Sequence, residues 1–568
     1  MILIKEKVNS NKNILSTSLA FIVGLSLICA GAFYEWLSCM ISLLLIVWLF
    51  LKIKVDGRLA FRAGFTSVSC ALIVTGYLLS VFWAVDRGMA FVGFLKFLPL
   101  PLFLICVYSE NRAVPYIKNT IPVLAAVMVA ATAVLMQIPP LKDYFSVAER
   151  LSGTFQYPNT FALFLLVAEL LAFGLQIKKH FKAIIFALLI FGILYTGSRT
   201  VLVLAAVANI VVIICSVRFS KKSALISIIA FVAVIAVAGG LAFYGISPFD
   251  RLLKINFTSS TFVGRMLYFK DALPVILKHP FGLGYLGYFY TQTTFQTGIY
   301  SVKYIHNDIL QLCLDIGWIP AVGLTASVVK SLFSRGVLLT DRIILAVMFL
   351  HILFDFDLQF IAVFMLLFLF MKKDGGKEIT INRNSFSFSA ALAVFAAVSL
   401  YFSVALGLYS FGATNAADAM YSLNTDNKIK MLISLKRTDG FEEVADSILD
   451  RNPYVYIAYG EKARAAYKDG DFGELIKYKN LVFEYAPLVY DEYEEYCYML
   501  INGVTLYDEA SDTHSAEICK KQLLATKEKF DENFKKIGKL GKMIKDKPQT
   551  RFPDDIEDYI KKLDKEGI

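Results

Sequence analysis

Long apolar stretches separated by short polar loops recur along the first 410 residues. Each stretch runs for about 18–25 residues, the length that a helix needs to cross the ~30 Å hydrocarbon core of a bilayer. Beyond these residues Lys, Glu, Asp and Tyr become frequent and no spanning stretch follows. The pattern predicts an all-α polytopic membrane helical bundle of about 12–13 spans over 1–410, and a soluble α-helical domain over 411–568.

We expect thirteen membrane spans, with boundaries good to a few residues. They lie at 14–33, 35–53, 65–84, 89–107, 119–137, 159–177, 181–197, 200–217, 223–245, 307–333, 341–355, 356–371 and 385–410. The stretch 341–371 is read as a hairpin that turns at Asp355 and Asp357, because carboxylates are hydrated at a membrane surface but costly inside a bilayer. A single span there would place the C-terminal domain in the cytoplasm. The N-terminus lacks a small-residue cleavage site, so we expect a retained first span.

Charge supports this topology. The chain is 57% hydrophobic and carries a net charge of +10, and its mean hydropathy is +0.59. Lys and Arg concentrate in alternate short loops, as the positive-inside bias requires when the N-terminus is cytoplasmic. Membrane topology therefore accounts for the net positive charge, and we expect no nucleic-acid partner. A long polar loop at about 246–305 then lies on the extracytoplasmic side, and so does the C-terminal domain.

The C-terminal domain contains one helical hairpin that the sequence predicts in detail. Residues 451–487 read as helix, turn at Asp469–Asp471, helix, and Pro453 and Pro487 are 34 residues apart. This is the period of tetratricopeptide repeats. We expect a TPR-like domain over 411–568 that can dock a protein partner.

Five polar signatures fall on the predicted outer side. They are Arg150 followed by Gly153–Asn159, Arg199 in YTGSRT, Arg265 at the start of an amphipathic helix that Pro280 ends, His306-Asn307 before an apolar helix, and His351 with Asp355 and Asp357. Each also has a structural interpretation: Gly153–Asn159 as a bend and helix start, Arg150 and Arg199 as interfacial anchors, His306 as a capping or packing residue, and the acidic pair as a hairpin turn. Their accumulation on one side favours a functional site.

Read in order, these signatures are GTFxxPN, GSR, GRxxxxKDALPxxxxHPFGLG, HNDxLQ and HxxxDFDLQF. Their order over about residues 60–375 resembles the O-antigen ligase and O-antigen polymerase superfamily of bacterial envelope enzymes. Pro320 departs from the ligase pattern, which usually has Gly, Thr or Tyr there. The thirteenth span and the helical tail resemble Gram-positive members.

The resemblance implies an enzyme that transfers a glycan from an undecaprenyl-diphosphate carrier to an acceptor hydroxyl at the outer face of the cytoplasmic membrane, with inversion and without a metal or other cofactor. A sugar hydroxyl needs a base, and His306 is suited to that role. The departing diphosphate needs fixed positive charge. Matching the family by position makes His306 and Arg265 the catalytic candidates, and Arg199, Arg150, Asn307 and Asp355 the substrate-binding candidates.

Three questions stay open at this point. Polymerase and ligase use the same donor chemistry and differ in the acceptor, which is a glycan or a wall or protein group; no feature points to lipid A. A transporter or flippase is compatible with thirteen spans, although the chain lacks matched halves with broken helices. A membrane-anchored scaffold acting through the tail would keep its activity in the isolated tail.

Overall fold

The structure is a computed structural model that describes residues 2–217, 260–372, 376–382, 386–435, 440–544 and 547–566, with a few further positions between 236 and 245. These residues form two compact units. Unit 1 holds the described residues of Met1–Leu79, Phe91–Asn256 and His306–Ser410, and unit 2 holds those of Ser80–Ala90, Phe257–Ile305 and Phe411–Ile568. Residues 80–90 and 257–305 thus fold with the C-terminal segment, and the predicted domain boundary at residue 410 stays a prediction.

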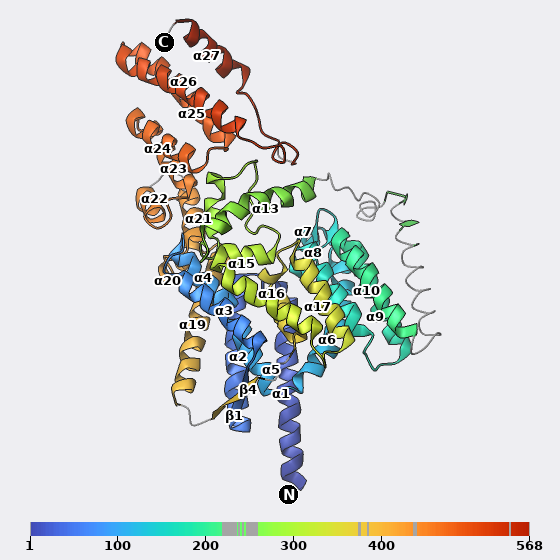
Figure 1. The fold of residues 1–568 in the computed structure, drawn as a ribbon. Coiled ribbons are helices and arrows are strands. Elements are labelled where there is room, and N and C mark those ends of the chain that lie inside the picture. Colours follow the sequence, from blue (N-terminus) through green and yellow to red (C-terminus); the bar gives the residue numbers. More distant parts are fainter. Residues whose placement is uncertain are drawn as a thin grey trace. The chain divides into compact units, whose positions relative to one another are not determined.

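Unit 1 is a bundle of apolar helices, which confirms the predicted all-α membrane architecture (Figure 1). Its helices are α1 (Ile2–Ile28), α2 (Glu35–Asp56), α3 (Phe65–Ser80), α4 (Arg87–Phe97, of which the first four residues belong to unit 2), α5 (Pro99–Ser109), α6 (Ala113–Leu135), α7 (Pro139–Phe145), α8 (Pro158–Ala172), α9 (Lys179–Thr196), α10 (Arg199–Val217), α15 (Asp308–Ile316), α16 (Trp318–Phe333), α17 (Leu339–Ile352), α18 (Ile361–Phe370) and α19 (Phe386–Ser410). Short 3₁₀ turns lie at η1 (Ala30–Ala32), η2 (Gly153–Phe155) and η4 (Asp357–Gln359). The long helix α19 packs along α2, α1 along α6, and α8 along α9.

Five helices among the described residues are long and apolar enough to cross a membrane: Glu35–Asp56, Arg87–Ser109, Ala113–Leu135, Lys179–Thr196 and Ser387–Ser410. Other apolar helices are shorter, of 10–17 residues. The predicted span at 223–245 and the start of the long loop lie outside the described residues. The five long helices coincide with the spans predicted at 35–53, 89–107, 119–137, 181–197 and 385–410.

Two predicted spans are wrong in detail. Residues 307–333 are not one helix, because Gly317 breaks them into α15 and α16 with φ 88° and ψ −177°, a backbone conformation open to glycine alone. Residues 356–371 contain only ten α-helical residues, in α18, after the 3₁₀ turn η4. At 1.5 Å per residue, α18 covers about 15 Å, half of a hydrocarbon core.

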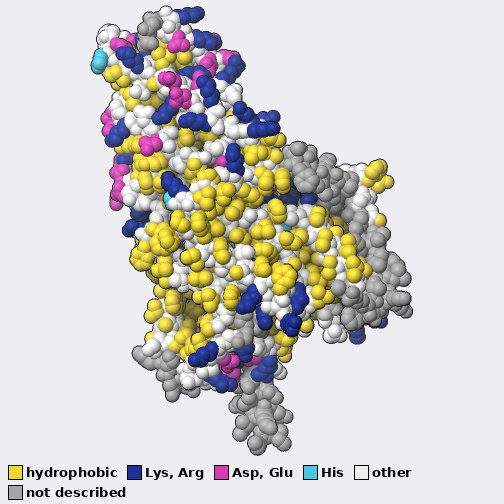
Figure 2. All heavy atoms as spheres, in the orientation of Figure 1, with side chains coloured by type: hydrophobic (Ala, Val, Ile, Leu, Met, Phe, Trp, Pro, Cys, Tyr) yellow, Lys and Arg dark blue, Asp and Glu magenta, His cyan; other side chains and the backbone are white. Residues whose placement is uncertain are grey.

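Apolar side chains cover much of the visible face of the unit 1 helices (Figure 2). Large hydrophobic residues are exposed on five different helices: Phe21, Val127, Val203, Ile319 and Val394. In water such patches would be costly, but against lipid tails they are in their preferred solvent. The composition of this surface therefore agrees with a multi-pass membrane protein.

Two short antiparallel ribbons interrupt the helices of unit 1. Strand β1 (Arg58–Ala63) pairs with β4 (Lys377–Asn382), in a register that places Arg58 opposite Asn382. Strand β2 (Ser146–Val147) pairs with β3 (Arg150–Leu151). The sequence predicted polar loops here, and the second ribbon places Arg150 at a defined position.

Unit 2 combines the long loop with the helical tail. Its elements are α13 (Ser260–Lys278), α14 (Gly287–Thr291), η3 (Gln292–Thr294), α20 (Thr414–Met420), α21 (Thr425–Leu435), α22 (Phe441–Leu449), α23 (Tyr456–Lys468), α24 (Phe472–Tyr485), α25 (Tyr490–Glu509), α26 (Thr513–Lys535) and α27 (Asp554–Glu566). The predicted hairpin at 451–487 is present as α23 and α24, and the Asp471 side chain caps α24 by accepting from the Glu474 amide. Its assignment as a TPR-like repeat stays a prediction.

Candidate functional site

His306 lies at the centre of a polar cluster in unit 1. It precedes α15 with φ 55°, in the left-handed region that few non-glycine residues adopt. Its Nδ1 atom lies 3.0 Å from Oδ1 of Asp355, and its side chain is 22% exposed, against 2% for the carboxylate. The ring of Phe356 packs edge-on against the imidazole, with centroids 5.0 Å apart. The imidazole is therefore held on one side while another part of it reaches solvent.

Asp355 is the point where separate parts of the chain meet. Its Oδ1 accepts hydrogen bonds from the Tyr157 hydroxyl at 2.7 Å and the Phe356 amide at 3.1 Å, and its Oδ2 accepts from Asn159 Nδ2 at 2.8 Å. An ionised carboxylate can only accept, so Nδ1 of His306 carries the proton in this pair. The other ring nitrogen, Nε2, then has a lone pair that can accept a proton.

The burial of this turn overturns one expectation. Asp355 and Asp357 were expected to be hydrated at the surface, but both are almost completely buried. Hydrogen-bond donors supplied by the protein replace water around both carboxylates, which is the condition under which buried charge is tolerated. The expectation of a hairpin turn between α17 and α18 is confirmed, and the expectation of a hydrated turn is wrong.

A second His–Asp pair lies beside the first. Nδ1 of His351 is 2.5 Å from Oδ2 of Asp357, and the Thr160 hydroxyl donates to Oδ1 of Asp357 at 2.6 Å. Asp308, directly after the His306-Asn307 pair, accepts from the Leu358 amide at 2.8 Å. All four residues are almost completely buried. Together, these contacts join α17, α8 and α15 next to His306.

Arg150 connects the first two signatures to this cluster. Its Nη2 donates to Asn159 Oδ1 at 2.6 Å, and its Nε donates to the Thr196 carbonyl at 2.6 Å. Thr196 ends α9 and is followed by the turn that leads to Arg199, the first residue of α10. Pro158 begins α8, as expected for a helix start, while the Asn159 side chain bonds to Asp355 and Arg150. Arg150, the Arg199 turn and His306 therefore belong to one connected arrangement.

Asn307 caps α15. Its Oδ1 accepts from the amides of Ile309 and Leu310 at 3.1 and 3.0 Å, and its Nδ2 donates to the Leu353 carbonyl at 3.0 Å. One side chain thus sets the start of α15 and joins it to the end of α17. The motif does stand at a helix start, with Asn307 rather than His306 as the cap. The prediction that Asn307 binds substrate stays a prediction.

We expect Asn307→Ala to destabilise the protein by about 1 kcal/mol, because α15 loses its N-cap and the tie to Leu353. The measurement is the thermal unfolding midpoint of the purified full chain in detergent. Asn307→Ser is the matched control, since serine restores the cap acceptor and should recover most of the midpoint. Equal midpoints for the alanine variant and the native chain would contradict the capping role.

Arg265 is the one candidate that lies in the other unit. It sits half-buried on α13 of unit 2, whereas His306, Asn307, Asp355, Arg150 and Arg199 belong to unit 1. Within unit 1, His306 and Asp355 contact one another directly, and Arg150 reaches Asp355 through Asn159. Asn307 follows His306 in the chain, and Arg199 is reached through the turn after Thr196. Sequence reasoning missed Tyr157, Thr160 and Asp308. Each adjoins a quoted motif, so polar residues within YPNT and HND were the available signal.

Part of the chain resembles a known protein family. Residues 184–325 match the O-antigen ligase family model. Over these residues the chain is similar to O-antigen ligases. The match confirms the resemblance to the O-antigen ligase and polymerase superfamily and indicates lipid-linked glycan transfer in surface-polysaccharide assembly. Arg199, Arg265, His306 and Asn307 lie inside the matched segment, whereas Arg150 and Asp355 lie outside it. No curated protein or solved structure gave a match.

Proposed function

We propose that this protein transfers a glycan from an undecaprenyl-diphosphate carrier to an acceptor hydroxyl at the outer face of the cytoplasmic membrane. The observation that carries the proposal is the His306–Asp355 pair at 3.0 Å. Its histidine belongs to the matched segment, and its carboxylate is anchored by Tyr157 and Asn159. A partly exposed imidazole on a buried, anchored carboxylate is the arrangement that a general base requires.

In the proposed reaction, Nε2 of His306 takes the proton of the acceptor hydroxyl. The hydroxyl oxygen attacks the anomeric carbon from the side opposite the carrier, so a new glycosidic bond forms as the bond to the diphosphate oxygen breaks. The products are the extended or attached glycan, with inverted configuration, and undecaprenyl diphosphate. Asp355 has a positioning role here: it keeps the Nδ1 proton in place and stabilises the imidazolium that forms.

The leaving diphosphate gains negative charge, and we assign its stabilisation to arginine. Guanidinium groups bind phosphate oxygens through paired hydrogen bonds and remain charged at any physiological pH. Arg265 is the first candidate and Arg199 the second, because both lie in the matched segment. Arg150 already donates to Asn159 and Thr196, so we propose that it positions Asn159 against Asp355.

The acceptor distinguishes two forms of this proposal. Addition to another glycan repeat makes the protein a surface-polysaccharide polymerase, and addition to a wall or protein group makes it a ligase. We propose that the C-terminal segment faces the same extracytoplasmic side and contributes to partner or substrate binding. The charge pattern of the loops supports this orientation.

The test uses the purified full chain in liposomes. The donor is the undecaprenyl-diphosphate-linked glycan extracted from a strain that lacks the protein, supplied with a cell-envelope fraction as acceptor. We expect release of undecaprenyl diphosphate together with a longer or envelope-attached glycan. Donor that crosses the membrane intact, with no release of undecaprenyl diphosphate, would instead support a flippase.

A further inference from the structure

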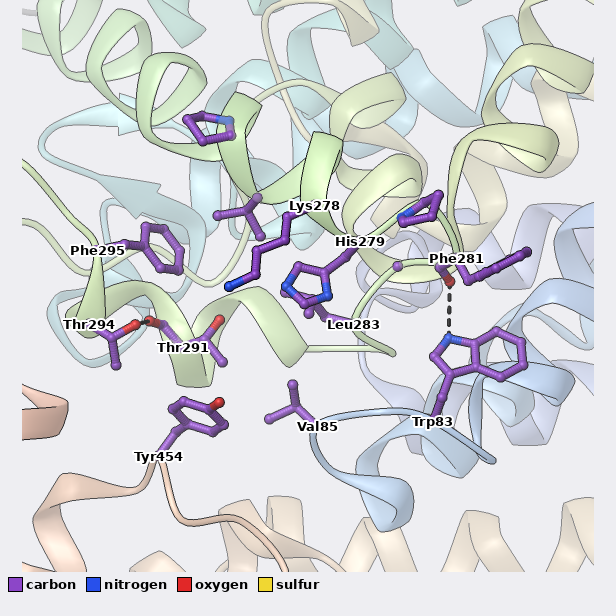
Figure 3. Close-up of a pocket in the computed structure, with 14 residues that line it drawn as sticks. Trp83, Val85, Lys278, His279, Phe281, Leu283, Thr291, Thr294, Phe295 and Tyr454 are labelled. Atoms are coloured by element: carbon purple, nitrogen blue, oxygen red, sulfur yellow. Dashed lines mark hydrogen bonds between the residues drawn. The ribbon is translucent and has the colours of Figure 1, made fainter.

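Unit 2 contains a cavity of about 710 Å³ that the transfer site does not use (Figure 3). Its walls come from three parts of the chain: residues 83–85, residues 274–295 and Tyr454 of the tail. The size falls within the range of small-molecule sites, which is about 300–1,000 Å³. All three parts belong to the same unit, so the cavity is a feature of unit 2 alone.

Aromatic rings form much of the wall. Trp83, Phe281, Phe295 and Tyr454 all line the cavity. Trp83 and Phe281 are exposed by 44% and 63%, although both are large apolar side chains. Exposed rings at a concave surface offer flat apolar faces, against which the C–H face of a sugar ring can pack.

The polar groups of the cavity have one sign of charge. Lys278 and His279 project into the space, and Thr291 and Thr294 face them from α14 and η3 (Figure 3). Burial, reinforced by the charge of Lys278, lowers the pKa of His279 and so favours its neutral form, which leaves Lys278 as the positive charge. None of the described residues that line the cavity carries a carboxylate. A negatively charged group of a ligand could pair with Lys278 here.

The walls are held in place by contacts within unit 2. The Trp83 indole donates to the Phe281 carbonyl at 3.1 Å, and the Val85 amide donates to the Leu283 carbonyl at 2.9 Å. The ring of Tyr454 packs edge-on against Tyr485, with centroids 5.5 Å apart. Such fixed rings lose little conformational freedom when a ligand binds.

The tail is tied to the same wall through Asp86. This buried carboxylate accepts from the Thr425 hydroxyl at 2.5 Å and from Asn452 Nδ2 at 3.3 Å. Asn452 also accepts from the Tyr454 amide at 3.2 Å. The C-terminal segment therefore contributes both a wall residue and the contacts that position it.

We propose that this cavity is a second glycan-binding site, which takes an acidic saccharide with its sugar ring against the aromatic wall and its carboxylate or phosphate on Lys278. The choice of ligand rests on the proposed function, since a protein that transfers glycans must hold a growing or accepting chain. The site gives the C-terminal segment a role in substrate binding, through Tyr454.

The test is isothermal titration of the purified full chain in detergent with two acidic probes: tetragalacturonic acid and a hyaluronan tetrasaccharide. The methyl ester of tetragalacturonic acid is the neutral counterpart. We expect saturable binding of at least one acidic probe, with Lys278→Met and Tyr454→Ala each weakening it by about tenfold or more. Lys270→Met is the matched control, because Lys270 is an exposed lysine on the same helix outside the cavity.

Three outcomes would overturn the proposal: no binding of any acidic probe, binding that Lys278→Met leaves unchanged, or inorganic diphosphate binding as tightly as the oligosaccharide. The last would indicate a simple anion site. His306→Ala should bind the probes as the native chain does, and loss of binding in that variant would also contradict a separate site. Transfer without probe binding would refute this inference alone, and probe binding without transfer would refute the proposed function alone.

Discussion

Replacing His306 by alanine is expected to lower the rate of glycan transfer by about 10²–10⁴-fold, the usual contribution of a general base. The imidazole is the group in unit 1 that combines solvent access with an anchored carboxylate behind it. Without the imidazole, no described residue at this position offers a neutral nitrogen that can take the proton from the acceptor hydroxyl. The measurement is the initial rate of undecaprenyl diphosphate release by the purified chain in liposomes.

The control for this variant is His180→Ala, which removes an exposed histidine near the start of α9. It should transfer at the native rate. Asp355→Asn provides a second comparison, because it keeps the side-chain volume but no longer holds the Nδ1 proton. If His306→Ala is inserted normally and its rate is within twofold of the native rate, His306 is not the base for transfer.

Replacing Arg265 by alanine is expected to lower transfer by about 10²–10³-fold, the scale seen when one stabilising donor is removed from a transition state. The physical reason is that negative charge develops on the leaving diphosphate. Arg265→Lys should recover only part of the rate, because an ammonium group keeps the charge but not the paired hydrogen bonds. The same release assay measures both variants.

Lys270→Ala is the matched control for Arg265, since it removes a positive charge five residues further along the exposed part of α13. It should leave transfer unchanged. A loss of transfer in Arg265→Ala that Lys270→Ala does not share would support the role of Arg265 at the diphosphate. Native activity in Arg265→Ala would contradict the role of Arg265, and Arg199 would then be the candidate that stabilises the diphosphate.

Run length and loop charge were sufficient to predict where continuous apolar helices occur, because a helix in lipid must satisfy its own backbone and needs a fixed length. They could not predict the break at Gly317, since apolar residues continue on both sides of it. Only the backbone conformation of that glycine separates α15 from α16. The β1–β4 ribbon was not predicted either, because it joins two loops that are distant in sequence.

The candidate site was predictable as a set of residues but not as an arrangement. His306, Arg150 and Asp355 stood out because polar side chains are rare beside apolar spans. Three partners of the two buried carboxylates, Tyr157, Asn159 and Thr160, lie 196–198 residues away in sequence, and no local pattern connects them to Asp355 or Asp357. The expectation that Asp355 and Asp357 are hydrated was wrong for the same reason. It assumed that a buried carboxylate finds no hydrogen-bond donors, whereas distant parts of the chain supply them.

The most direct test of the central claim compares the native strain with a chromosomal His306→Ala strain, profiling surface-glycan length and undecaprenyl-linked intermediates together. The account predicts that the variant is inserted normally and accumulates lipid-linked donor. Single repeat units with loss of long chains would identify a polymerase, and long lipid-linked chains without acceptor product would identify a ligase. Unchanged pools in a properly inserted variant would contradict His306 as the base for transfer.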